Sequence, residues 1–152
     1  MISIVNYQDK YKTAFKTLNE NWINKFFVLE PADIETLNHP EQIIDNGGFI
    51  FVALHQDEPV GVCALKKITS ERYELSKFAV AENTQGLGIG KRLIETCIAT
   101  AKQHQIKMLF LEGNTKLEAS IHLYRKYGFK ELDLSSHDSS YERVNIVMEL
   151  TV

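Results

Sequence analysis

The hydrophobic positions in the first third of the chain recur with the period of a helix. Over residues 10–23 apolar side chains return every three or four positions, which indicates an amphipathic helix with one buried face. A shorter helix is predicted over 32–37, because Pro31 stands where the first turn of a helix tolerates proline. A further turn or two is expected over 40–45. The alternating segment Ile2–Asn6 is predicted as a strand.

The period changes to two at Phe49. Alternating segments separated by short polar turns predict an antiparallel meander of three strands, over Phe49–His55, 60–67 and Arg72–Val80. A long helix is predicted over 88–104, and its buried stripe consists of Ile89, Leu93, Cys97 and Ala101. The last elements are predicted as a strand over 107–111, a helix over 117–127 that ends at Gly128, and strands over 129–132 and 143–150. A polar loop over 135–141 joins these two strands. The order of elements predicts a mixed α+β fold.

Length and composition favour an ordinary globular protein. Of the 152 residues 44% are hydrophobic and 24% charged, and we expect a single domain over residues 1–152. No apolar run approaches the roughly 18 residues that cross a bilayer. The net charge of −3 argues against nucleic acid as the main partner. We therefore expect a cytoplasmic protein that has neither a membrane nor a nucleic acid as its partner.

The residue types that bind metals show no ligand spacing. Cys63 and Cys97 stand 34 positions apart inside apolar stretches, which suits neither a zinc site nor a CxxC redox pair. The five histidines include no HxxxH-like pair. We therefore expect two buried thiols in a reducing compartment and no bound metal.

A glycine-rich segment lies where the meander meets the long helix. It reads Gln85, Gly86, Leu87, Gly88, Ile89, Gly90 and Lys91. Glycines at such a junction let backbone N–H groups approach an anion, and the helix dipole favours a phosphate or pyrophosphate there. The Walker A pattern fails, because Gln85 and Arg92 replace its first glycine and its Ser/Thr. The dinucleotide fingerprint fails as well, because Lys91 replaces its third glycine and antiparallel strands precede it.

The same segment resembles the Q/R-x-x-G-x-G/A loop of the GNAT superfamily of N-acetyltransferases. Upstream, 74–80 resembles the fourth strand of that superfamily, and downstream 123–129 resembles its L-Y-x-x-x-G-F segment. The resemblance covers about residues 2–150 and is specific over 74–129. It implies a GNAT-like α+β fold with a mixed, mostly antiparallel central sheet of about six to seven strands and about four flanking helices.

The resemblance also implies a co-substrate and a reaction. The co-substrate is acetyl-CoA, whose pyrophosphate binds the backbone of 85–91 and whose pantetheine inserts beside the fourth strand. The cofactor-binding residues expected are Phe78, Ala79, Val80, Gln85, Gly86, Leu87, Gly88, Ile89, Gly90, Lys91 and Asn114. The Val80 N–H is expected to polarise the thioester carbonyl. The reaction implied is direct transfer of acetyl to a primary amine in a ternary complex.

Two side chains are expected to catalyse that transfer. By the resemblance, Tyr124 is the general acid for the departing thiolate, although an aromatic on the buried face of a helix would look the same. Glu74 is the candidate base, with a solvated carboxylate as the alternative, and strand parity places it with Phe78 and Val80. Glu30 belongs to the acceptor region in relatives, but a carboxylate that stabilises a helix N-terminus explains it better.

Three questions stay open at this point: the function class, the acceptor and the oligomeric state. The chain is expected to be an acetyltransferase, and the competing hypothesis is a non-catalytic module that binds acyl-CoA and regulates a partner. The acceptor is either a small-molecule amine or an amino group of a protein. The oligomeric state is open too, with a homodimer, which relatives often form, as one alternative.

Overall fold

The computed structural model describes the backbone of residues 1–152 and every side chain except that of Ser136. The strands are β1 (Ile2–Asn6), β2 (Phe49–His55), β3 (Glu58–Lys67), β4 (Arg72–Val80), β5 (Met108–Gly113), β6 (Lys130–Glu131) and β7 (Ile146–Thr151). The helices are α1 (Lys12–Phe26), α2 (Pro31–Asn38), α3 (Glu41–Asp45), α4 (Ile89–Gln103) and α5 (Glu118–Lys126). Short 3₁₀ turns are η1 (Asp9–Tyr11), η2 (Glu82–Thr84) and η3 (Leu134–Ser136).

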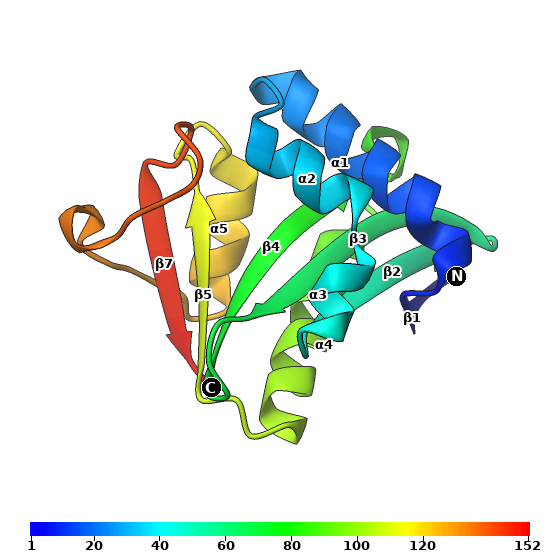
Figure 1. Ribbon diagram of the computed structural model, residues 1–152. Coiled ribbons are helices and arrows are strands. Elements are labelled where there is room, and N and C mark those ends of the chain that lie inside the picture. Colours follow the sequence, from blue (N-terminus) through cyan, green and yellow to red (C-terminus); the bar gives the residue numbers. More distant parts are fainter.

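The strands of the described backbone form one seven-stranded sheet in the order β1-β2-β3-β4-β5-β7-β6. Every neighbouring pair is antiparallel except β4 and β5, which run parallel. This pair is joined over only three residue pairs, Arg72–Glu74 with 108–110, and beyond them the strands separate (Figure 1). The predicted fold class, a mixed and mostly antiparallel sheet flanked by helices, is confirmed.

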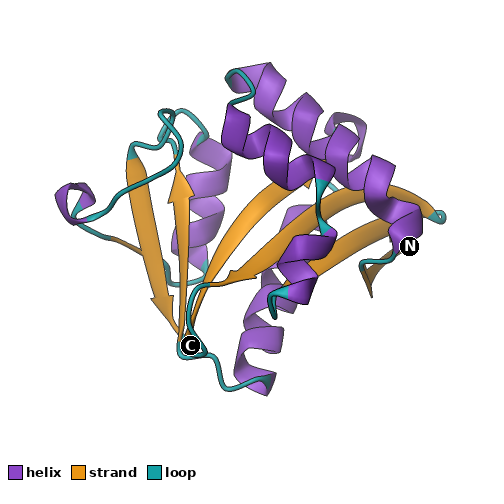
Figure 2. Ribbon diagram, viewed as in Figure 1, coloured by secondary structure: helices purple, strands orange, loops and turns teal.

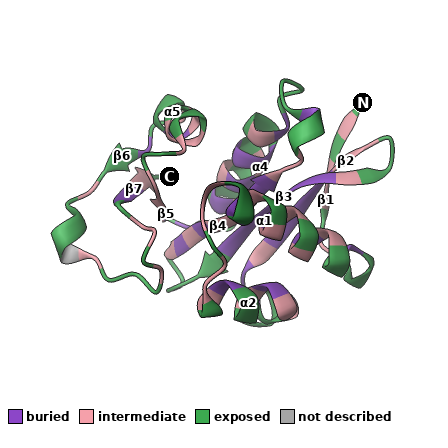
Figure 3. Cartoon of the chain, turned by 90° about the horizontal axis from the view of Figure 1, so that it is seen from above, coloured by how far each residue is buried: buried purple, intermediate pink, exposed green. Residues whose placement is uncertain are grey.

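The helices cover the two faces of the sheet (Figure 2), and a hydrophobic core lies against each face. On one face α4 and α5 pack on the sheet, and the stripe of α4 predicted from the sequence is buried at all four positions. On the other face α1, α2 and α3 cover the sheet, with Phe15 and Leu37 in the core. Figure 3 shows the buried residues gathered between these layers.

Several element boundaries differ from the prediction. The second strand of the meander begins at Glu58, because Gln56 and Asp57 both adopt left-handed backbone (φ 52° and 65°) and make a two-residue turn. The strand predicted over 129–132 is only two residues long. The strand predicted to begin at Arg143 begins at Ile146, because the Arg143 side chain is drawn toward α2 by acidic groups. The predicted boundaries of β1, β2 and β4 are confirmed.

A β-bulge in β4 reverses the side-chain alternation of that strand. Between Ala64 paired with Ser76 and Val62 paired with Ala79, β4 has one residue more than β3, and Lys77 has a φ of 51°. The predicted parity of Glu74 with Phe78 and Val80 is therefore wrong. Tyr73 and Leu75 lie in the α4-side core, and past the bulge Phe78 and Val80 pack against that same core.

The two cysteines are fully buried, as expected, and their Sγ atoms lie 3.7 Å apart across β3 and α4. Within the part of the chain that the structure describes, no group of three or more His, Cys, Asp or Glu side chains is arranged to hold a metal ion. None of the described helices combines the length and hydrophobicity needed to span a membrane.

The packing of α4 on the sheet generates a stability prediction. Leu93 is fully buried near the middle of α4, so Leu93→Ala should lower the free energy of unfolding by about 2–5 kcal/mol through lost contacts and a residual cavity. Lys102→Ala, at an exposed site of the same helix, should stay within about 0.5 kcal/mol. Urea unfolding of both variants measures the difference, and equal losses would contradict this packing.

Candidate active site

A cavity of about 590 Å³ opens where β4 and β5 separate. Its walls come from α1, α2, β4, β5, α5 and the loop that follows η3. Of the residues predicted from the sequence, the cavity is lined by Glu74, Phe78, Asn114 and Tyr124. The glycine loop lies outside its lining. The structure therefore brings the two candidate catalytic residues to one space.

Glu74 and Tyr124 reach the cavity from opposite faces of the sheet. Tyr124 belongs to the core beneath α4, whereas Glu74 alternates with residues of that core and points toward the α1–α2 face. The two faces communicate through the gap between the diverging strands. A molecule threaded through this gap would meet a phenol on one side and a carboxylate on the other.

Tyr124 is held as a neutral phenol. It is 8% exposed, and its ring lies 6.2 Å from that of Phe78 and 5.9 Å from that of Phe129. Burial raises the pKa of Tyr124 well above its ordinary value, and the nearby thiols Cys63 and Cys97 raise it further. Among the described residues none hydrogen-bonds its hydroxyl. The O–H is therefore available as a donor at every physiological pH.

Among the carboxyl groups that line the cavity, that of Glu74 has the pKa that departs most from its ordinary value. Burial raises the pKa of Glu74 to about 7, the charge of Glu112 raises it further, and Lys66, Lys77 and His137 oppose the rise. No described cation lies within ion-pair distance of its carboxylate. A carboxyl that titrates near neutrality can accept a proton from an amine.

The glycine loop presents bare backbone to solvent. Gly86 and Gly88 have positive φ (89° and 74°), and a Cβ on either one would meet nothing within 4 Å. Gly88 precedes α4 without a side-chain cap, and the first turn of the helix has no acidic residue. The N–H groups of that turn therefore face open space with the positive end of the helix dipole behind them.

Some residues expected at the cofactor have other partners. Gly90 packs closely against Phe78, because a Cβ there would lie 3.1 Å from Cζ of Phe78, closer than an ordinary contact. Asn114 uses both of its polar atoms within the protein: Nδ2 donates to the Arg143 carbonyl at 2.6 Å, and Oδ1 accepts from the Lys116 N–H at 2.8 Å. The Asn114 side chain thus fixes the loop between β5 and α5.

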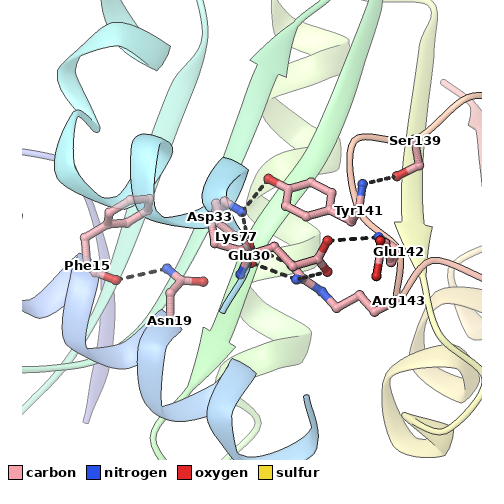
Figure 4. Close-up of polar contacts among 9 residues, drawn as sticks. All are labelled: Phe15, Asn19, Glu30, Asp33, Lys77, Ser139, Tyr141, Glu142 and Arg143. Carbon is pink, nitrogen blue, oxygen red and sulfur yellow. Dashed lines mark hydrogen bonds and ion pairs between the residues drawn. The ribbon is translucent and has the colours of Figure 1, made fainter. Parts of the chain in front are cut away.

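A network that the sequence analysis missed closes one side of the cavity (Figure 4). Arg143 donates to both carboxylate oxygens of Asp33 at 2.7 Å and to Glu30 at 3.0 Å. Lys77, in the bulge of β4, donates to Asp33 at 3.0 Å and to the Tyr141 hydroxyl at 2.9 Å. We call these five residues the polar bridge. The bridge ties α2, β4 and the loop before β7 together.

The polar bridge is electrically balanced although it is largely buried. Asp33 has no exposed surface, and burial opposes its ionisation, but the hydrogen bond from Arg143 and the charge of Lys77 outweigh burial and lower the pKa of Asp33. Glu30 is engaged by Arg143 and by the Glu142 N–H, so it is more than a carboxylate at a helix terminus. The only sequence signal for this network was a set of charged residues distributed over predicted helices, strands and loops, and it gave no pairing.

Comparison with known proteins assigns the family. The model of the acetyltransferase (GNAT) family matches residues 12–129, which is most of the chain. The chain therefore belongs to the GNAT acetyltransferase family, as the glycine loop and the L-Y-x-x-x-G-F segment had indicated.

Individual relatives agree with this assignment. A 5-NmdU N-acetyltransferase of Pseudomonas phage PaMx11 is 35% identical over 85 residues, which span 55% of this chain and 59% of that protein. A GNAT acetyltransferase from Staphylococcus aureus Mu50 superposes with a TM-score of 0.91 at 21% identity over 99% of both chains. A Salmonella typhimurium acetyltransferase described as solved with acetyl-CoA has a TM-score of 0.78 at 16% identity, over 99% of this chain and 94% of that one. The structural likenesses establish the fold.

The polar bridge generates a second stability prediction. Arg143→Ala should cost about 3–5 kcal/mol, because it leaves the buried Asp33 carboxylate with Lys77 as its main remaining cation. Arg125→Ala breaks an exposed pair with Glu131, at 3.4 Å and with both side chains more than half exposed, and should cost less than about 1 kcal/mol. Urea unfolding at pH 7 compares the two, and similar small losses would contradict a buried, coupled bridge.

Proposed function

We propose that the chain is an N-acetyltransferase that moves an acetyl group from acetyl-CoA to a primary amine by direct transfer in a ternary complex. The observation that carries the proposal is the gap between β4 and β5, with the Tyr124 phenol on one face and the Glu74 carboxylate on the other. Membership of the GNAT family and the N-acetyltransferase activity in the relative's name support it. The description of the Salmonella neighbour with acetyl-CoA supports the choice of co-substrate.

The glycine loop is the proposed pyrophosphate site. The backbone of Gln85–Lys91 offers N–H groups around glycines whose missing Cβ atoms leave open space, which suits a bulky anion. Lys91 adds a positive charge beside it, whereas a hydrogen bond to the Ile2 carbonyl commits the Arg92 guanidinium to β1. The residues present therefore fit the diphosphate of coenzyme A.

The free edge of β4 is the proposed pantetheine site. The Ala81 N–H donates to Val60 of β3 at 2.7 Å, so by the alternation of an antiparallel ladder the Val80 N–H points away from β3. That side is where β5 has diverged, so the backbone of Phe78–Val80 has room for an amide chain. The Val80 N–H is then a donor for the thioester carbonyl.

In the proposed reaction, the proton transfer from the amine and the proton transfer to the sulfur take place on opposite faces of the sheet. An amine enters as its ammonium ion and gives one proton to Glu74, and its nitrogen attacks the thioester carbonyl carbon. The C–S bond then breaks as the tetrahedral intermediate collapses, and the amide forms. The nitrogen gives its second proton to solvent, the sulfur gains a proton from Tyr124, and the resulting phenolate takes a proton back from solvent. Glu74 returns its proton to solvent.

The cofactor site predicts stabilisation by acetyl-CoA. A ligand that binds only the native chain should add about 2.7 kcal/mol at a hundredfold excess over its Kd, raising Tm. Gly88→Ala should weaken this binding, because a Cβ at a φ of 74° strains the loop and enters the anion space. Gly47→Ala carries a similar strain at a φ of 95° elsewhere and should leave affinity unchanged. Calorimetric titration measures both, and equal affinity in both variants would place the phosphates elsewhere.

The proposed role of Tyr124 as general acid predicts that removal of its hydroxyl lowers turnover and leaves the chain folded. Tyr124→Phe keeps the ring packing and should change stability by less than about 1.5 kcal/mol. Turnover should fall by about 10²–10⁴-fold, and by a similar factor at each pH from 6 to 9, because the raised pKa keeps the phenol protonated throughout. Kinetics at saturating acetyl-CoA, with an acceptor found by amine screening, measure this. Acetyl-CoA binding without turnover by the wild-type chain would favour the sensor hypothesis instead.

A further inference from the structure

An acid–imidazole pair lies on the wall of the same cavity. Glu112 stands near the end of β5, and His137 follows η3. His137 Nε2 lies 2.5 Å from Glu112 Oε2, and the two side chains are 17% and 11% exposed. The His137 ring also contacts Phe110 edge-on, with 6.0 Å between ring centroids. The imidazole is thus held in place by a carboxylate on one side and an aromatic ring on the other.

The sheet register puts Glu112 on the same wall as Glu74. In the parallel pair Glu74 is opposite Phe110, and such partners project to the same face of a sheet. Glu112 is two residues beyond Phe110, so it projects to that face as well. Leu109 and Leu111, which alternate with them, pack into the core on the other face. Glu112 is therefore the next side chain along the wall from which Glu74 projects.

We propose that Glu112 and His137 are positioning residues whose opposite charges move, in opposite directions, the pH at which the buried Glu74 gives up its proton. As a statement about catalysis this rests on the proposed function, since it takes Glu74 as the base. As a statement about electrostatics it stands on the geometry of the cavity wall. The negative charge of Glu112 favours the protonated form of Glu74, and a positive charge on the imidazole of His137, held against Glu112, opposes that effect.

Two lysines outside this pair act on Glu74 more strongly than His137 does. Lys66 on β3 lies directly opposite Glu74 in the register, and Lys77 on β4 is held by Asp33 of the polar bridge. Both are cations that favour the charged form of Glu74, and neither is paired with Glu112. The other titratable groups that line the cavity are Glu35, His39, Lys67, Tyr124, Asp138, Tyr141 and Arg143.

The test measures the pKa of Glu74 in the ligand-free protein by carbon-13 NMR of its side-chain carboxyl. Glu112→Gln removes a negative charge and should lower the pKa of Glu74 by about one unit. His137→Gln retains an amide donor for Glu112 but cannot carry a positive charge, so it should raise the pKa of Glu74 by less than Glu112→Gln lowers it. The double variant should lie between the two single variants. His122→Gln, at an exposed site on α5, is the matched control and should change nothing.

Shifts of opposite sign in the two variants indicate an effect of charge on the pKa of Glu74. A structural effect, such as looser packing around the cavity, would move this pKa in the same direction in both variants. Shifts of the same sign, or no shift in either variant, would overturn the proposal. With an acceptor in hand, the acidic limb of the pH profile of kcat/KM should move in the same order, and Glu74→Gln should abolish that limb. A wild-type chain that acetylates no amine would contradict the proposed function, whereas opposite NMR shifts would still support the electrostatic coupling.

Discussion

The site depends on the short parallel contact between β4 and β5. Parallel strands need a long crossover connection, and here α4 with the loops at its two ends supplies it. The two strands share hydrogen bonds over three residue pairs and then part, which leaves backbone polar groups of β4 without a strand partner. Unpaired strand edges inside a protein need another partner. The fold thus creates a place for an amide-bearing chain between its own strands.

The bulge at Lys77 determines which side chains of β4 lie on each side of the gap between β4 and β5. One extra residue in β4 turns Phe78 and Val80 toward the α4-side core, while Glu74 keeps facing α1 and α2. Without the bulge, the groups beside the glycine loop and the candidate base would share one face. The left-handed backbone of Lys77 is a conformation that a lysine adopts at a cost, and the ion pair with buried Asp33 holds it there.

Burial determines the protonation of both candidate catalytic groups. Tyr124 and Glu74 are removed from water on opposite faces, and in each case burial is the main cause that raises the pKa. For the phenol the result is a permanent donor, and for the carboxyl it is a group that titrates near pH 7. The polar bridge in the same cavity wall has no net charge, because its two carboxylates are paired with one guanidinium and one ammonium. Lys77 is thus engaged by Asp33, and together with Lys66 and His137 it offsets the effect of burial on the pKa of Glu74 only in part.

The sequence by itself determined the elements, the family and most of the candidate residues, because these depend on local periodicity and on contiguous motifs. Alternation located β2 and β4, the glycines located the loop before α4, and the segment around Tyr124 indicated the acid. Only the tertiary structure decided the parity of β4, the contact of Asn114 with Arg143, the partners of Glu30, and the pairs Asp33–Arg143 and Glu112–His137. Each of these joins residues 25 or more positions apart, or depends on one inserted residue in a strand. Local sequence patterns carry no information about such contacts. The energy of these contacts depends on short distances and on burial, and both arise only when the sheet and its helices pack together.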